Sequence, residues 1–322
     1  MQVNDIQYLI CINNHQNTRH MHDLKSNFDK ILPIVKLTLA DQLNDQGNLQ
    51  FYPNPPKLPD SHIISLALLQ EALSIDSELW FWSKLTCDYA QDFPDLPDRS
   101  RYNRRRKRLA GWIHQLTQLW GKQLCPFENT FMVDSIPIPV AHIAREYATK
   151  ICREHLETAP DKGYSATLGQ YYLGYKLHLV VTLNGVFHSM DLTKASVHNI
   201  QYLKDLKHSG LQDCLLLADK GYLSSQGQLD LFLSKGIELQ TPMRRNQKGY
   251  HPWPVTFKKA RRRVETIFSQ LCDQLMLKRN YAKTFGGLTT RIISKVAAVT
   301  FLQYLNKQND QPINHIKHAL AV

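Results

Sequence analysis

Apolar residues in the first 125 positions recur at helical spacing, in short runs separated by proline-rich turns. The passage 48–60 contains four prolines and is interpreted as a loop. Beyond it the spacing predicts helices over 63–73 and 79–89, and a third helix over 100–124. Three helices joined by turns are compatible with a helix-turn-helix arrangement, so we expect an all-α N-terminal region.

After position 130 the pattern becomes typical of strands. The segment 131–140 is apolar and β-branched, although its two prolines cannot donate to a ladder and are expected to end its pairing. The runs 171–183 and 186–192 flank Asn184-Gly185, a pair typical of tight hairpin turns. The sequence therefore predicts an antiparallel hairpin here.

The following apolar segments alternate between strand and helix. Residues 214–218 and 237–241 are interpreted as strands and 225–234 as the helix between them, which predicts a parallel pair with a right-handed crossover. Helices are also predicted over 258–277 and 288–305. The second half is therefore expected to be α/β, a mixed sheet with flanking helices.

The net charge of +11 belongs entirely to this second half. Residues 1–130 contain 14 basic and 14 acidic side chains, whereas the remainder holds 25 basic and 14 acidic ones. A positive field of this size attracts polyanions, nucleic acid first and acidic membranes second, with solubility alone as the alternative.

Two segments concentrate the basic residues. One opens the helix predicted over 100–124 and has no acidic residue from position 99 until Glu128: Arg99, Arg101, Arg104, Arg105, Arg106, Lys107 and Arg108. We expect it to contact DNA, because uncompensated cations repel one another unless phosphates neutralise them, although an ordinary charged face remains an alternative.

The second basic segment lies between Glu238 and Glu265, where there is no acidic residue. Its cations are Arg244, Arg245, Lys248, Lys258, Lys259, Arg261, Arg262 and Arg263. Tyr250 and Trp253 stand among them, so an unpaired base could stack where phosphates are held. Three prolines interrupt any amphipathic helix before Lys258, which favours DNA over a membrane surface.

Three carboxylates stand out by position. Asp134 interrupts an apolar strand, Asp219 follows a strand of the parallel unit, and Glu265 lies beside the apolar stripe of its helix. Taken singly they could be a turn former, an Asx residue and an ion-pair partner of a nearby arginine. Together they are the oxygen ligands that two Mg²⁺ or Mn²⁺ ions require for an in-line phosphoryl displacement.

Several other classes of protein lack support. The six cysteines include no CxxC pair, and no GxSxG, P-loop or GxGxxG motif occurs. The ligand-like spacings at Cys152/His155 and His20/His22 lack further zinc ligands nearby. No apolar run approaches about 18 residues, so a cytoplasmic protein is expected.

Four of these motifs resemble those of the DDE transposases of bacterial insertion sequences, most closely the insertion-sequence 982 family. They are VDSIPIPV around Asp134, ASVHN at 195–199, LLLADKGY ending at Tyr222, and RRRVETIFSQL around Glu265. The resemblance implies an RNase H-like catalytic domain over 126–310, an N-terminal DNA-binding region over 1–125 and a tail over 311–322. Related families place a basic residue about two turns after the glutamate; here 271 and 272 are Leu and Cys, so Lys278 or Lys220 is the candidate substitute.

The sequence thus predicts a transposase that cuts the ends of its element and joins the freed 3′ hydroxyl to target DNA. Asp134, Asp219 and Glu265 are the predicted catalytic and metal-binding residues, with two Mg²⁺ or Mn²⁺ ions. DNA, both terminal inverted repeats and target, is the expected partner of a homodimer in the bacterial cytoplasm, bound to the nucleoid when active. The alternatives are a plain metal-dependent nuclease and a DNA-binding regulator derived from a transposase. The predicted DNA-binding residues are Arg99, Arg101, Arg104, Arg105, Arg108, Lys220, Arg244, Arg245, Lys258, Lys259, Arg261 and Arg262.

Overall fold

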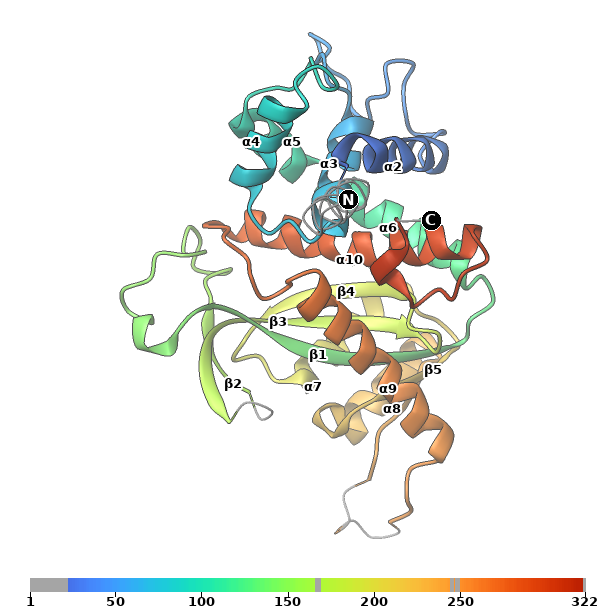
Figure 1. The fold of residues 1–322 in the computed structure, drawn as a ribbon. Helices are drawn as coiled ribbons and strands as arrows, with labels where there is room; N and C mark the ends of the chain where they lie inside the picture. Colours follow the sequence, from blue (N-terminus) through green and yellow to red (C-terminus); the bar gives the residue numbers. More distant parts are fainter. Residues whose placement is uncertain (1–22, 166–168, 244–245, 247–249, 321–322) are drawn as a thin grey trace, which may run out of the picture. The chain divides into compact units, whose positions relative to one another are not determined.

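The computed structural model describes residues 23–165, 169–243, 246 and 250–320, which divide into two compact units. The first unit contains the chain up to Leu116 together with Ala297–Val322, and the second contains Thr117–Val296. The helix α10 (Phe285–Gln308) contributes to both units (Figure 1). The two units divide α10 after Val296. The catalytic domain over 126–310 stays a prediction.

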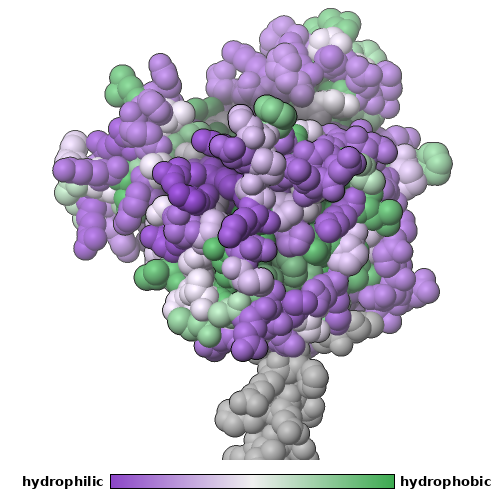
Figure 2. Space-filling model, turned by 90° about the horizontal axis from the view of Figure 1, so that it is seen from above, coloured by the Kyte–Doolittle hydropathy of each residue, from purple (hydrophilic) through white to green (hydrophobic). Residues whose placement is uncertain are grey.

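The first unit is helical. Its helices are α2 (Leu24–Thr38), α3 (Asp60–Ala72), α4 (Glu78–Asp88), α5 (Arg99–Arg108), the first half of α6 (Ala110–Leu124) and the short η5 (Ile316–His318). Side chains of Asp23, Ser77 and Asp98 cap the first turns of α2, α4 and α5. Hydrophilic residues cover most of the face visible in Figure 2, and hydrophobic ones are scattered over it in small groups.

The helix predicted over 100–124 is two helices. Tyr102, Leu109, Ile113 and Leu116 are all buried, so the apolar stripe that predicted one helix does run through both. The backbone departs from helical geometry only at Leu109, where ψ is 0° and the N–H bonds to the carbonyls of both Arg105 and Lys107. A periodicity argument does not detect such a kink, because the stripe keeps its face across it.

The second unit contains a curled mixed sheet flanked by helices. Its strands are β1 (Thr130–Ala141), β2 (Asp161–Ser165), β3 (Gln170–Thr182), β4 (Phe187–Lys194), β5 (Leu215–Ala218) and β6 (Glu238–Gln240). The order is β2-β3-β1-β5-β6, with β4 also on β3. β1 is antiparallel to β3 and parallel to β5, which is parallel to β6. The predicted hairpin is confirmed as β3–β4, with Gly185 at φ +77° in its turn.

Helices cover both faces of this sheet. They are α7 (Asn199–Asp205), α8 (Ser225–Lys235) and α9 (Val255–Ser269), with the short turns η1 (Ile143–Arg145), η2 (Leu206–His208), η3 (Lys220–Tyr222) and the π-helical η4 (Gln270–Gln274). One buried cluster joins α7 and α8 to the face that carries Phe131, Val133, Leu216 and Ala218. The helix α9 contacts β1 and β5 and crosses the sheet in Figure 1.

Three sequence predictions differ in detail. The two prolines of β1, Pro137 and Pro139, do not end its pairing with β3, which continues to Ala141. β1 pairs with β5 only as far as Val133. Beyond that residue the edge of β1 that would face β5 has no partner strand, so a proline without an N–H can lie there without loss of a ladder hydrogen bond. The helix predicted over 258–277 changes into a π turn at Gln270, and β2 was not predicted at all.

One helix among the described residues, α10, is long and apolar enough to span a membrane. However, 78% of its most apolar window is buried inside the protein, which is typical of a core helix. The sequence of α10 is not one uninterrupted apolar run, because Arg291 and Lys295 lie within it.

Candidate active site

The two aspartates extend from neighbouring strands. The last registered pair between β1 and β5 is Val133 with Ala218, and Asp134 and Asp219 each come one residue later. Adjacent strands lie roughly 4.8 Å apart, so the two backbones are close neighbours. Val133 and Ala218 belong to the core on the α7/α8 side. Since side chains alternate along a strand, both carboxylates are directed to the opposite face, where α9 lies.

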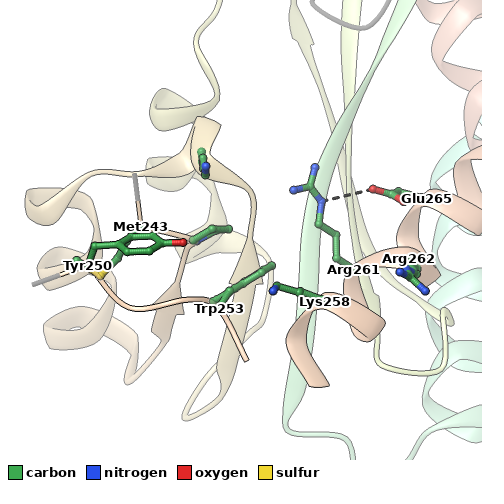
Figure 3. A pocket seen from close by; sticks show the side chains of 9 residues that line it. Met243, Tyr250, Trp253, Lys258, Arg261, Arg262 and Glu265 are labelled. Carbon is green, nitrogen blue, oxygen red and sulfur yellow. Dashed lines mark ion pairs between the residues drawn. The ribbon is translucent and has the colours of Figure 1, made fainter. Parts of the chain in front are cut away.

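The helix α9 brings Arg261 and Glu265 to this face. Val264 is buried, which fixes that side of the helix against the sheet, while Glu265 is 57% exposed. The Nη2 atom of Arg261 lies 4.0 Å from Oδ2 of Asp219, and its Nε lies 3.5 Å from Oε1 of Glu265 (Figure 3). Arg261 therefore lies between the two carboxylates and partly neutralises them.

The three predicted carboxylates interact electrostatically. Burial raises the pKa of Asp134 from 3.8 to about 6, and the negative charges of Asp219 and Glu265 act in the same direction. The N–H of Ser135, which donates to Oδ1 of Asp134 at 2.7 Å, and the charge of Arg261 oppose the shift. A cation bound at this face would relieve the same repulsion.

The donor set fits a hard divalent cation at the two aspartates. Carboxylate oxygens from separate strands are the ligands that Mg²⁺ and Mn²⁺ prefer. Within the described part of the chain no three His, Cys, Asp or Glu side chains are close enough to hold an ion together as they stand. Glu265 is paired with Arg261, so it would join the site only after exchanging that partner.

A basic pocket of about 460 Å³ adjoins Glu265 (Figure 3). It is lined by Lys220, Pro242, Met243, Tyr250, Trp253, Lys258, Arg261, Arg262 and Glu265. Among the predicted DNA-binding residues, Lys259 is exposed on α9 outside this lining. Arg244 and Arg245, also predicted, lie outside the described residues. Lys278 lines a different pocket, beside Pro137 and Tyr171, so Lys220 is the nearer of the two candidate substitutes.

The arginines of α5 are less free than their sequence suggests. Arg105 Nη2 lies 2.6 Å from Oδ1 of the fully buried Asp60, and its Nη1 donates to the carbonyl of Leu58. Arg106 is buried and reaches Glu78 at 3.3 Å. The premise that these cations are uncompensated is therefore wrong, since their acidic partners come from α3 and α4.

The remaining predicted arginines of α5 differ in exposure. Arg99 pairs with Glu78 at 3.2 Å and Arg101 with Asp98 at 3.1 Å, both at the surface. Arg104 and Arg108 are exposed. These two are the α5 arginines best placed to meet a DNA backbone or base edge from solvent.

Sequence reasoning missed Ser135 and Asn199, the polar residues behind Asp134 and Asp219. His198 in the ASVHN motif caps α7 by accepting from the N–H of Ile200. Its neighbour Asn199 donates from Nδ2 to Oγ of Ser135 at 3.2 Å. The ASVHN motif marks this segment in the sequence. The hydrogen bond from Asn199 to Ser135 of β1 could not be predicted from it, because that contact depends on the tertiary structure.

The raised pKa of Asp134 predicts a pH-dependent stability. The folded state binds this proton more tightly than the unfolded chain, so the stability contributed is greatest at low pH and falls as pH rises from about 4 to about 6. At pH 7.5 without metal, Asp134→Asn is therefore expected to stabilise the fold by about 3 kcal/mol. Thermal unfolding of both proteins between pH 4 and 8 in EDTA checks this. If the stability of the two proteins changed with pH in the same way, the carboxylate of Asp134 would not be destabilised by burial.

Comparison with known proteins identifies the family. A family model described as the transposase DDE domain matches residues 126–301, more than half of the chain and including all three carboxylates. No curated protein and no solved structure matches the chain. The family implies a metal-dependent enzyme that processes nucleic acid, with DNA as its partner. The chain belongs to the DDE transposase family.

Proposed function

We propose that this protein cleaves DNA at the ends of its own element and joins the freed 3′ hydroxyl to target DNA, as its resemblance to the insertion-sequence 982 family suggests. The observation that carries the proposal is the pair Asp134 and Asp219 on adjacent parallel strands, facing a helix that carries Glu265 and Arg261. An RNase H-like sheet and a helix-turn-helix-like N-terminal region are part of the same proposal.

The reaction has two displacements at phosphorus. In the first, a water oxygen attacks a phosphodiester at the element end and the P–O3′ bond breaks, which leaves a 3′ hydroxyl and a 5′ phosphate. In the second, that hydroxyl attacks a target phosphodiester and displaces the target's own 3′ oxygen. Two bound Mg²⁺ or Mn²⁺ ions would activate the attacking oxygen and stabilise the leaving one.

The protein's own residues hold and orient the reactants. Asp134 and Asp219 would bind the ions, and Glu265 would complete the site once Arg261 pairs with a DNA phosphate instead. Lys220, Lys258 and Arg262 line the adjoining pocket and would fix the backbone on either side of the scissile bond. Tyr250 and Trp253 line the same pocket and offer ring faces to an unpaired base.

The two basic surfaces are expected to respond differently to substitution. Lys258→Gln with Arg262→Gln should weaken binding of all duplexes alike and reduce the salt slope by about one unit for each phosphate that is no longer neutralised. Arg104→Gln with Arg108→Gln should reduce the preference for element ends, by about 1 to 3 kcal/mol for each side chain that reads a base. Binding to end and scrambled duplexes across a salt series measures both effects.

Lys204→Gln on α7 is the matched control, because it removes an exposed cation from the sheet face opposite α9. It should leave both affinities nearly unchanged. If the α5 pair instead lowers both affinities equally, α5 attracts phosphates without reading sequence.

The activity assay separates the proposal from its rivals. The full-length protein is incubated with Mg²⁺ or Mn²⁺, a labelled duplex carrying the terminal repeats that flank its gene, and a supercoiled plasmid as target. The proposal predicts cleavage at the 3′ end followed by joined products. Cleavage without joining would indicate a nuclease, and binding without cleavage a regulator.

A further inference from the structure

A chain of hydrogen bonds lies directly behind the two aspartates. On β1, Ser135 follows Asp134 and its side chain is directed to the α7/α8 face. The Nδ2 atom of Asn199 donates to Oγ of Ser135 at 3.2 Å, and Oδ1 of Asn199 accepts from Nζ of Lys176 at 3.3 Å. Both polar atoms of the Asn199 amide therefore have hydrogen-bond partners. Lys176 is fixed in turn, because it also donates to the carbonyl of Val197.

The same amide lies against the turn that carries Asp219. A methyl group placed on Gly221 would lie 3.2 Å from Nδ2 of Asn199 and 2.9 Å from Oδ1 of Asp219. That oxygen accepts from the N–H of Gly221 at 2.7 Å. Asn199 therefore hydrogen-bonds the residue after Asp134, and its amide lies beside the turn that orients Asp219.

A buried pair of rings supports the other end of this turn. Tyr222, which is fully buried, places its hydroxyl 3.0 Å from Nδ1 of His178, and Nε2 of His178 lies 3.0 Å from Oγ1 of Thr193. His178 stacks on Tyr202 at a centroid distance of 4.1 Å. Because both ring nitrogens have partners and the ring is sealed from water, this part of the turn is rigidly placed.

We propose that Asn199 is a positioning residue that sets the geometry of Asp134 and Asp219 for a divalent cation. The inference rests on the proposed function, since it concerns the same site. Two carboxylates on adjacent strands repel each other, so their strand ends tend to separate unless something holds them. Asn199 hydrogen-bonds β1 and lies beside the Asp219 turn, on the side that the cation does not occupy, so it limits the movement of the two strand ends. Substitution of a group that orients a metal ligand typically weakens metal binding roughly 10- to 100-fold.

The test measures Mn²⁺ binding by the full-length protein, from the loss of the free-ion signal in electron paramagnetic resonance, without DNA. Asn199→Ala is expected to raise the apparent dissociation constant for Mn²⁺ about tenfold or more. Ser135→Ala removes the same hydrogen bond by deleting a single oxygen and should give a comparable shift. The shift in the double variant should be smaller than the sum of the two single shifts, because both single changes delete the hydrogen bond between Asn199 and Ser135.

The matched control is Gln228→Ala. Gln228 also donates an amide hydrogen bond of 3.2 Å, from α8 to the carbonyl of Leu239, away from the aspartates. It should lower the melting temperature about as much as Asn199→Ala does and leave Mn²⁺ affinity unchanged. An equal shift in Gln228→Ala, or wild-type Mn²⁺ affinity in folded Asn199→Ala and Ser135→Ala, would overturn the inference.

The same measurement separates this inference from the proposed function. Asp219→Asn must weaken Mn²⁺ binding if the carboxylate site exists. If the wild-type protein and Asp219→Asn bind Mn²⁺ alike, the metal site of the proposed function fails, and the role of Asn199 with it. If Asp219→Asn binds weakly and the Asn199 variants bind normally, only the role of Asn199 is refuted.

Discussion

Asp134→Asn, Asp219→Asn and Glu265→Gln are each expected to reduce DNA cleavage by about 10³-fold or more, since the ions they hold contribute several kcal/mol to the transition state. Each change preserves shape and removes a negative charge, so folding and binding of element ends should persist. Because the three side chains act as one unit, double variants should be little worse than single ones. Cleavage rates in Mg²⁺, measured with a labelled end duplex, give the comparison.

Asp191→Asn provides the control for this series. Asp191 is an exposed residue of β4 in the same sheet, and the pKa of its carboxyl is raised, as that of Asp134 is, by partial loss of solvation. Cleavage by Asp191→Asn should match that of the wild-type protein. Wild-type cleavage by one of the three site variants would remove that residue from the site, and additive losses in the doubles would argue against a shared metal cluster.

Arg105→Met is expected to destabilise the protein by about 3 to 5 kcal/mol, because it leaves the buried carboxylate of Asp60 without its cation. Asp60 is fully buried and also accepts from the Tyr52 hydroxyl and the N–H of Leu49, which cannot neutralise its charge. Arg108→Met, at an exposed position of the same helix, should change stability by less than about 0.5 kcal/mol. Urea denaturation of both variants measures the difference.

This prediction changes the role assigned to Arg105. The basic run in the sequence predicts that Arg105 binds DNA, whereas its contacts indicate that it stabilises the first unit. A variant that keeps full stability and loses DNA affinity would restore the original interpretation. Arg105→Lys is informative as well, because lysine keeps the charge but cannot reproduce two directed contacts to Asp60 and to the Leu58 carbonyl.

Local signals predicted much of the second unit. Asn184-Gly185 requires a tight turn, and the hairpin around it forms as expected. The strand-helix-strand segment ending at β6 produces the predicted parallel pair. The placement of Asp134 and Asp219 at neighbouring strand ends follows from the same reasoning, because carboxyl ends of parallel strands share one edge.

Features that depend on distant partners were not predictable. Arg105 pairs with Asp60 across 45 positions and Arg99 with Glu78 across 21, so a charge run that looks uncompensated in sequence is largely paired in the fold. The strand β2 has no alternating apolar pattern, and it forms through pairing with β3, where Gly163 packs against Ala195 and Tyr172. The helical period accounts for the buried Leu271 and Leu275, but it does not reveal that the helix changes into a π turn at Gln270.

Anomalous diffraction from crystals grown with Mn²⁺ tests the central claim most directly, because it locates the ion relative to the carboxylates without depending on activity. We expect a manganese peak in contact with both Asp134 and Asp219, with Glu265 turned from Arg261 toward the site. Crystals of Asp219→Asn grown in the same way should lose that peak. A manganese peak at other side chains, or none between the two aspartates at millimolar Mn²⁺, would contradict the assignment of this face as the catalytic site.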